Sequence, residues 1–186
     1  MKDIEYDGDA LEWLGVRYKT ILTPEDSDGT MSIVDSWSPA GSGPPRHIHY
    51  DEDETFVILT GTCRVWIAGQ DRIAGPGETV FIPRGTEHTF KVTGDAPSRH
   101  LVILTPGGFD GFFAEMARGQ FSLPEDMAKI EAAAARSNLA FTGPPLESPL
   151  ARKTYRLSNP RPSLPAASRA PRGTARPARS VHGPAR

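Results

Sequence analysis

The sequence predicts an all-β sandwich or barrel, followed by two short helices and a disordered tail. Three observations lead to this prediction. Residues 10–105 consist of short apolar segments cut by Gly, Pro and Asp. Residues 109–136 carry apolar side chains at helical spacing. Residues 143–186 contain eight Arg and nine Pro but few large apolar residues.

Seven β-strands are expected, because seven segments combine β-branched or aromatic residues with an apolar or alternating pattern. They are Arg17–Leu22, Thr30–Trp37, Thr55–Leu59, Cys63–Ala68, Thr79–Ile82, His88–Val92 and Arg99–Leu104. Dipeptides such as Asp28-Gly29 and Thr60-Gly61 provide residues that suit tight turns. No segment repeats at a fixed period, which argues against a solenoid or a propeller.

Two amphipathic helices are expected after Pro106. In the first, the apolar residues are Phe109, Phe112, Phe113 and Met116. The second is predicted from Ser122 and Glu125, which have the spacing of a capping box, and it ends near Arg136. We expect Met127, Ile130 and Ala134 to face the barrel. Both apolar stripes are interpreted as packing surfaces.

Charge divides the chain near Gly143. The whole chain has a formal net charge of −2, from 21 Lys and Arg and 23 Asp and Glu. Residues 143–186 hold nine basic residues and one acidic residue, a net of +8, so residues 1–142 carry −10. A basic segment with so few apolar residues does not bury enough surface to offset the entropy of ordering it. We therefore assign residues 1–142 to the barrel with its helices and residues 143–186 to a disordered tail.

Composition argues against several classes of protein. A single cysteine, Cys63, excludes an internal disulfide framework and a Cys-rich zinc module; we expect it to pack in the core. The acidic, polar start and the lack of a long apolar run predict a cytoplasmic protein with no membrane association. For the tail, a solvated extension is favoured over nucleic-acid binding through its arginines.

Two histidines and a glutamate form a candidate metal site. His47 and His49 are two residues apart, so on an extended strand both imidazoles lie on one face. Glu54 opens the next strand, which we expect to run antiparallel beside them. Imidazole and carboxylate suit a borderline divalent metal, and two histidines with one carboxylate are typical of non-haem iron sites. The acidic residues 51–53 are alternative ligands, but a solvated turn is the favoured interpretation for them.

A second segment adds a third histidine. Residues 77–92 predict a strand that ends in a turn with Pro83 and Gly85, after which His88 begins the returning strand. If His88 faces the same interior, it is the fourth ligand. His100, on a later strand, is interpreted as a core or rim residue.

These two segments resemble the two motifs of the cupin family. The first motif, G-x5-H-x-H-x4-E-x6-G, is matched at Gly41, His47, His49, Glu54 and Gly61. The second, G-x5-P-x-G-x2-H-x3-N, is matched at Gly77, Pro83, Gly85 and His88, with Val92 in place of the asparagine. The resemblance implies a cupin-type jelly-roll barrel. It also implies one divalent transition metal ion (Fe, Ni, Mn, Co, Cu or Zn) bound by His47, His49, Glu54 and His88.

Among cupins, the chain resembles single-domain proteins grouped with quercetinases, the flavonol 2,3-dioxygenases. The resemblance includes the Thr-Pro-Gly-Gly-Phe stretch at 105–109 and the helical segment after it. It implies an O₂-dependent reaction on a small flavonol- or β-dicarbonyl-like substrate, with Glu54 as both ligand and base, and it implies a homodimer. Two alternatives stay open. One is another metal-dependent reaction, such as isomerisation or decarboxylation, and the other is a non-catalytic small-molecule-binding or regulatory cupin.

An apolar, aromatic substrate pocket is expected around the metal. Phe56 and Ile58 are two and four residues after Glu54, so on a strand they lie on the same face as Glu54. The residues at 90 and 92 lie in the same way on the face of the histidine at 88. An earlier strand adds an apolar face that we expect to point inward. The predicted lining residues are Met31, Ile33, Trp37, Phe56, Ile58, Phe90 and Val92.

Overall fold

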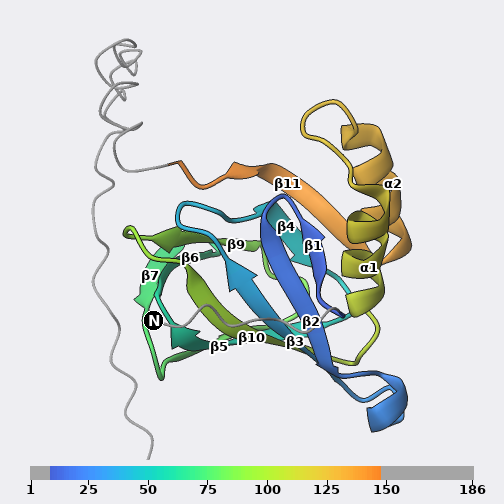
Figure 1. The fold of residues 1–186 in the computed structure, drawn as a ribbon, viewed down its shortest axis with the longest axis horizontal. Coiled ribbons are helices and arrows are strands. Elements are labelled where there is room, and N and C mark those ends of the chain that lie inside the picture. Colours follow the sequence, from blue (N-terminus) through green and yellow to red (C-terminus); the bar gives the residue numbers. More distant parts are fainter. Residues whose placement is uncertain (1–8, 148–186) are drawn as a thin grey trace, which may run out of the picture. The chain divides into compact units, whose positions relative to one another are not determined.

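Two antiparallel β-sheets face each other and enclose the core (Figure 1). The computed structural model describes residues 9–147. Its strands are β1 (Leu11–Trp13), β2 (Val16–Leu22), β3 (Ser32–Ser38), β4 (Pro45–His49), β5 (Asp53–Thr60), β6 (Thr62–Ile67), β7 (Gln70–Ala74), β8 (Thr79–Ile82), β9 (His88–Thr93), β10 (Ser98–Thr105) and β11 (Leu139–Pro145). One sheet has the strand order β1-β2-β3-β10-β5-β8 and the other β11-β4-β9-β6-β7.

This arrangement confirms the predicted jelly roll. The seven predicted strands correspond to β2, β3, β5, β6, β8, β9 and β10. Within residues 9–147 no strand pairing joins the two sheets, so the predicted barrel is a pair of facing sheets and not a closed cylinder. Of the other four strands, β4 is the extended strand expected for His47 and His49, and β1, β7 and β11 were not predicted and lie at the edges of their sheets.

The core lies between the sheets and is built from alternate residues of their strands. The most deeply buried apolar side chains include Val34, Ile58, Val65, Val92 and Leu104, each at most 1 % exposed. Burial of one such side chain stabilises the fold by about 1.5–3 kcal/mol. The turn between β5 and β6 requires glycine, because Gly61 has φ +75° and a Cβ there would lie 2.5 Å from the carbonyl oxygen of Pro97.

Two helices, α1 (Asp110–Gly119) and α2 (Met127–Arg136), lie on one side of the sheets (Figure 1). Their apolar faces bury Phe112, Met116, Ile130, Ala133 and Ala134. The capping-box spacing predicts that α2 starts at Ser122, but the helix begins five residues later, at Met127. Asp126 precedes the helix and accepts a hydrogen bond from the backbone N–H of Ser122. Among the described residues, neither ten-residue helix is long enough to cross the hydrocarbon layer of a membrane.

The last strand, β11, holds β4 in place. β11 pairs antiparallel with β4, with Leu139 opposite His49 and Phe141 opposite His47. On its other side β4 pairs with β9 only between His47 and His88. β11 runs across the boundary predicted at residue 142, while residues 148–186, most of the predicted tail, lie outside the described residues.

Candidate metal centre and ligand cavity

Three histidines and one glutamate meet between the two sheets. His47 and His49 lie on β4 and His88 on β9, and Glu54 lies on β5 of the opposite sheet. One potential ligand atom from each side chain lies within 4.8 Å of the others. The four residues are only 1–7 % exposed. The structure therefore brings together the four side chains that the sequence predicted as ligands.

The expected hairpin between the strand of His47 and His49 and the strand of Glu54 is wrong. β5 pairs with β10 and β8, whereas β4 pairs with β11 and β9. Residues 50–52 carry the chain from one sheet to the other. Facing sheets lie about 10 Å apart, so inward side chains from both can reach a common point. The ligands thus face one another across the interior.

Backbone carbonyl groups orient two of the histidines. Nδ1 of His47 lies 2.7 Å from the carbonyl oxygen of Pro45, and Nδ1 of His88 lies 2.8 Å from that of Thr86. Since a carbonyl oxygen only accepts, both Nδ1 atoms carry the hydrogen and donate it. Each ring, when neutral, then presents the lone pair of Nε2. Metal-binding histidines are held in this way by their outer partners.

Glu52 lies beside Nδ1 of His49, in the position that a backbone carbonyl group occupies beside each of the other two histidines. Its Oε2 is 3.5 Å from Nδ1 of His49, at the limit of hydrogen-bond distance. Both atoms are buried, and within residues 9–147 neither has a hydrogen-bond partner. Buried polar atoms normally have partners. The pair therefore fits a histidine that donates from Nδ1 to Glu52 when its Nε2 binds a cation.

The three acidic residues at 51–53 have different environments. The predicted solvated turn is wrong for Glu52, which is 8 % exposed. Asp51 is exposed and accepts a hydrogen bond from the side-chain amide of Asn138. Asp53 accepts hydrogen bonds from the backbone and guanidinium of Arg84. None of the three belongs to the four-residue cluster.

Burial and mutual proximity shift the pKa values in the cluster. Burial, together with the nearby charges of His88 and His49, lowers the pKa of His47 to about 3. Burial alone would raise the pKa of the Glu54 carboxyl, but the hydrogen bond from His88 and the charges of the histidines hold it at about 2. For His88, burial is outweighed by Glu54, whose Oε2 lies 2.7 Å from Nε2, so its pKa is raised. An ionised carboxylate with three imidazoles is a donor set suited to borderline divalent metals.

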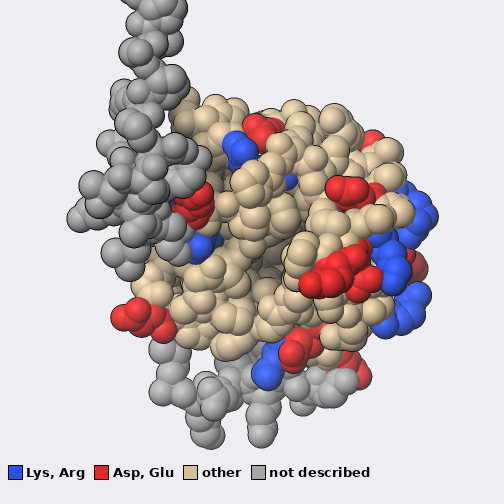
Figure 2. Space-filling model, turned by 90° about the horizontal axis from the view of Figure 1, so that it is seen from above, with Lys and Arg blue, Asp and Glu red and all other residues tan. Residues whose placement is uncertain are grey.

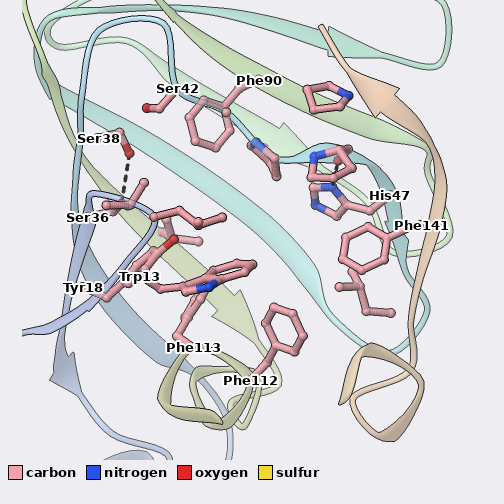
Figure 3. Close-up of a pocket in the computed structure, with 18 of the residues that line it drawn as sticks. Trp13, Tyr18, Ser36, Ser38, Ser42, His47, Phe90, Phe112, Phe113 and Phe141 are labelled. Carbon is pink, nitrogen blue, oxygen red and sulfur yellow. Dashed lines mark hydrogen bonds between the residues drawn. The ribbon is translucent and has the colours of Figure 1, made fainter. Parts of the chain in front are cut away.

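The cluster opens into a cavity of about 430 Å³. This volume lies in the usual range for small-molecule sites. The lining includes Trp13, Tyr18, Phe56, Phe90, Phe109, Phe112, Phe113 and Phe141, contributed by both sheets, by α1 and by the segment that precedes it. Phe109 stands edge-on to His49, with ring centroids 4.2 Å apart. Figure 3 shows the aromatic side chains arranged around the cavity, and uncharged residues form much of the face seen in Figure 2.

Two of the seven residues predicted for the substrate pocket line this cavity. Phe56 and Phe90 line the cavity. Ile58 and Val92 are buried in the core and are absent from the lining.

The predicted inward face of β3 is wrong. Met31, Ile33 and Trp37 do not line the cavity, and the guanidinium of the exposed residue Arg17 lies over the Trp37 ring. The buried residues of this strand's inner face are Ser32, Val34, Ser36 and Ser38. Three of these four are polar, so a search for apolar residues selects the opposite face. Trp13, Tyr18 and the two inner serines at 36 and 38 are cavity residues that the sequence prediction missed.

Comparison with known families agrees with this geometry. Residues 36–104, which contain all four cluster residues, match the family described as Cupin domain. The fold and the buried cluster therefore define a cupin domain with a candidate metal centre.

The chain is similar in sequence to quercetin 2,3-dioxygenase from Bacillus subtilis, with 30 % identity over 108 residues that cover 58 % of this chain and 32 % of the relative. It is also 33 % identical over 57 residues to mannose-1-phosphate guanylyltransferase ManC from Salmonella typhimurium, covering 31 % of this chain and 12 % of the relative. The chain thus matches about a third or less of the length of these relatives. The structure of KdgF from Halomonas sp. aligns with a TM-score of 0.51 at 19 % identity, over 58 % of this chain and 94 % of KdgF, which supports the fold.

Proposed function

We propose that this protein is a metal-dependent dioxygenase that acts on a small flavonol- or β-dicarbonyl-like substrate. The observation that carries the proposal is the buried cluster of three histidines and one glutamate, which opens directly into an aromatic cavity. The similarity to the Bacillus subtilis quercetin 2,3-dioxygenase supports the substrate class.

His47, His49, Glu54 and His88 would hold one divalent transition metal ion. Such an ion supplies Lewis acidity, which lowers the pKa of an enol or hydroxyl group bound to it. His47 and His88 are pre-oriented by the carbonyl groups of Pro45 and Thr86, so little side-chain entropy is lost on binding.

Glu54 is the group that accepts a proton from the substrate. It lines the cavity, and one carboxylate oxygen lies 2.7 Å from Nε2 of His88. The carboxylate is ionised at neutral pH, since its pKa is held at about 2. A carboxylate is an effective base towards an acidic proton, such as that of an enol bound to a metal ion. Flavonols and β-dicarbonyls carry such a proton.

The aromatic lining positions the substrate and excludes water. Phe56 and Phe90 stand edge-to-face with ring centroids 5.4 Å apart, and both line the cavity. Phe109 packs against His49 beside the cluster. Aromatic walls favour a flat, largely apolar ligand whose polar group points to the cluster.

Two measurements test the proposal. Elemental analysis of the full chain, purified without a histidine tag, identifies the bound metal. An oxygen electrode then measures uptake with flavonols and β-dicarbonyls, for the metal-loaded protein and for Glu54→Gln. We expect oxygen uptake by the wild type, at a rate that Glu54→Gln lowers by at least about a hundredfold, which is the usual contribution of a general base.

Other outcomes would replace the proposal. Tight ligand binding without oxygen uptake across the panel would favour a binding or regulatory protein. Conversion of substrate without oxygen uptake would favour an isomerase or a decarboxylase. We also propose a homodimer, which sedimentation of the full chain tests.

A further inference from the structure

The cavity has a second polar region that is not part of the metal cluster. Ser36 on β3 lies directly opposite Tyr18 on β2 and directly opposite His100 on β10. Side chains paired in this way project from the same face of a sheet, with Cβ atoms about 4.5–5.5 Å apart. All three residues line the cavity. We call Tyr18, Ser36 and His100 the distal polar row.

The distal polar row lies well away from the metal cluster. Ile58 on β5 pairs with His100, and Glu54 lies on the same strand, four residues before Ile58. At about 3.3 Å per residue, the two positions are about 13 Å apart along the backbone. Phe56 lies between them, and it faces the cavity. Figure 3 shows Tyr18 and Ser36 on one side of the cavity and His47 on the other.

Hydrogen bonds orient the ring of His100. Nδ1 lies 3.3 Å from the hydroxyl of Ser98, which accepts a hydrogen bond from the thiol of Cys63, also at 3.3 Å. While it accepts from Cys63, the Ser98 hydroxyl still has its hydrogen and a second lone pair for Nδ1 of His100, so Nε2 acts as a donor in one tautomer of the ring and as an acceptor in the other. The rings of Phe56 and Phe90 stand edge-to-face to His100, with centroids 5.6 and 5.1 Å away.

The polar groups of the distal polar row retain hydrogen-bonding capacity. Within residues 9–147, neither Nε2 of His100 nor the hydroxyl of Tyr18 has a hydrogen-bond partner. Ser36 makes a side-chain contact only with the hydroxyl of Ser38, at 3.4 Å. His100 and Ser36 are each 1 % exposed, and both side chains line the cavity, so their polar groups can be reached from inside it. A ligand oxygen in the cavity would satisfy them.

We propose that the distal polar row binds a hydroxyl or carbonyl oxygen at the end of the ligand that is remote from the metal. This inference rests on the proposed function and narrows its substrate class. The ligand is a flavonol with its 3-hydroxy-4-keto group at the cluster, an aromatic body packed against the contacting pair Phe56 and Phe90, and a hydroxyl on the far ring. Nε2 of His100 and the hydroxyls of Tyr18 and Ser36 donate to this oxygen or accept from it.

A pair of ligands that differ by one hydroxyl tests the inference. The full chain is loaded with Zn²⁺, which is redox-inactive, so that neither ligand is consumed. Equilibrium binding of 3-hydroxyflavone and 3,4′-dihydroxyflavone is followed by the change in flavonol absorbance. We expect the dihydroxy ligand to bind about five- to tenfold more tightly, the size of one or two net hydrogen bonds.

Variants connect this preference to the distal polar row. Tyr18→Phe and Ser36→Ala are each expected to lower the affinity ratio, and the double variant to lower it further, with the remaining preference due to His100. The affinity for 3,4′-dihydroxyflavone should fall more than that for 3-hydroxyflavone, because only the first ligand has a far hydroxyl. Ser32→Ala is the matched control: Ser32 lies on the same face of β3, is buried, and does not line the cavity.

The outcomes separate this inference from the proposed function. If both ligands bind with equal affinity, or if the double variant keeps the wild-type ratio of the two affinities, the distal polar row does not bind the far hydroxyl and the inference fails. If neither ligand binds, the flavonol class and the inference are both overturned. Oxygen uptake with an unchanged affinity ratio would leave the proposed function standing alone.

Discussion

Replacing Glu52 with glutamine removes a buried negative charge and leaves the size of the side chain almost unchanged. Oε2 of Glu52 lies 3.5 Å from Nδ1 of His49, and within residues 9–147 neither atom has a hydrogen-bond partner. A carboxylate in this position holds the hydrogen on Nδ1 and makes Nε2 a stronger ligand. Loss of such an outer partner weakens metal binding by about 10- to 100-fold, or about 1.4–2.7 kcal/mol. Glutamine keeps an acceptor oxygen, so we expect the lower end, about tenfold.

Competition between the metal-free full chain and a chromophoric chelator for Zn²⁺ measures the two Kd values. Asp53→Asn is the matched control, since it makes the same change of charge one residue away. Asp53 pairs with Arg84 and lies outside the cluster. The Kd of the Asp53→Asn variant for Zn²⁺ should therefore stay within about twofold of the wild-type value. Equal Kd values for Glu52→Gln and wild type would refute the role of Glu52, as would an equal loss in the control.

Four further outcomes are expected. His49→Ala and Glu54→Ala should each lose most of the bound metal by elemental analysis and keep the β-sheet circular dichroism, because each removes one ligand of the cluster. Ile58→Ala, at a side chain 1 % exposed, should lower the free energy of unfolding by about 2–5 kcal/mol in urea, and Phe81→Ala, at one 59 % exposed, by much less. Burial lowers the pKa of His100 from 6.5 to about 4, so the unfolded chain binds more protons between these values and stability falls as pH decreases through them. Between about pH 7 and about pH 5 this lowers the free energy of unfolding of the metal-free protein by about 2 kcal/mol. Urea titrations of His100→Gln should not show this decrease. Truncation after residue 147 should leave metal content unchanged, because all four ligands and β11 precede it.

The strands that the sequence predicted are those with a clear local pattern. β5 and β10 alternate between buried and less buried residues along most of their length, which is the pattern that alternation detects. β7 is exposed at four of its five positions and therefore has no apolar alternation. β11 contains Gly143 and two prolines, residues that normally disfavour a strand, and the sheet accepts them because β11 lies at an edge.

The four cluster residues were predictable because their spacing is a local property of two short segments. The pairing of β4 and β5 with different sheets was not predictable from that spacing, because it depends on the whole topology. The inner face of β3 was assigned wrongly because it carries serines where a cavity, and not only apolar core, lies beside it. The distal polar row depends on the register of three strands, one of which, β10, is distant in sequence from the other two.

The pairing of β4 with β11 has a consequence for the order in which the site forms. The strand with His47 and His49 receives most of its ladder from residues 139–145, about ninety positions later in the chain. Contacts of such long sequence separation form late, because their loop-closure entropy is spent before the contact stabilises anything. During synthesis, the histidine strand lacks this neighbour until the ribosome has released the segment around residue 145. The cluster of His47, His49, Glu54 and His88 therefore reaches its final geometry only after β11 has been translated.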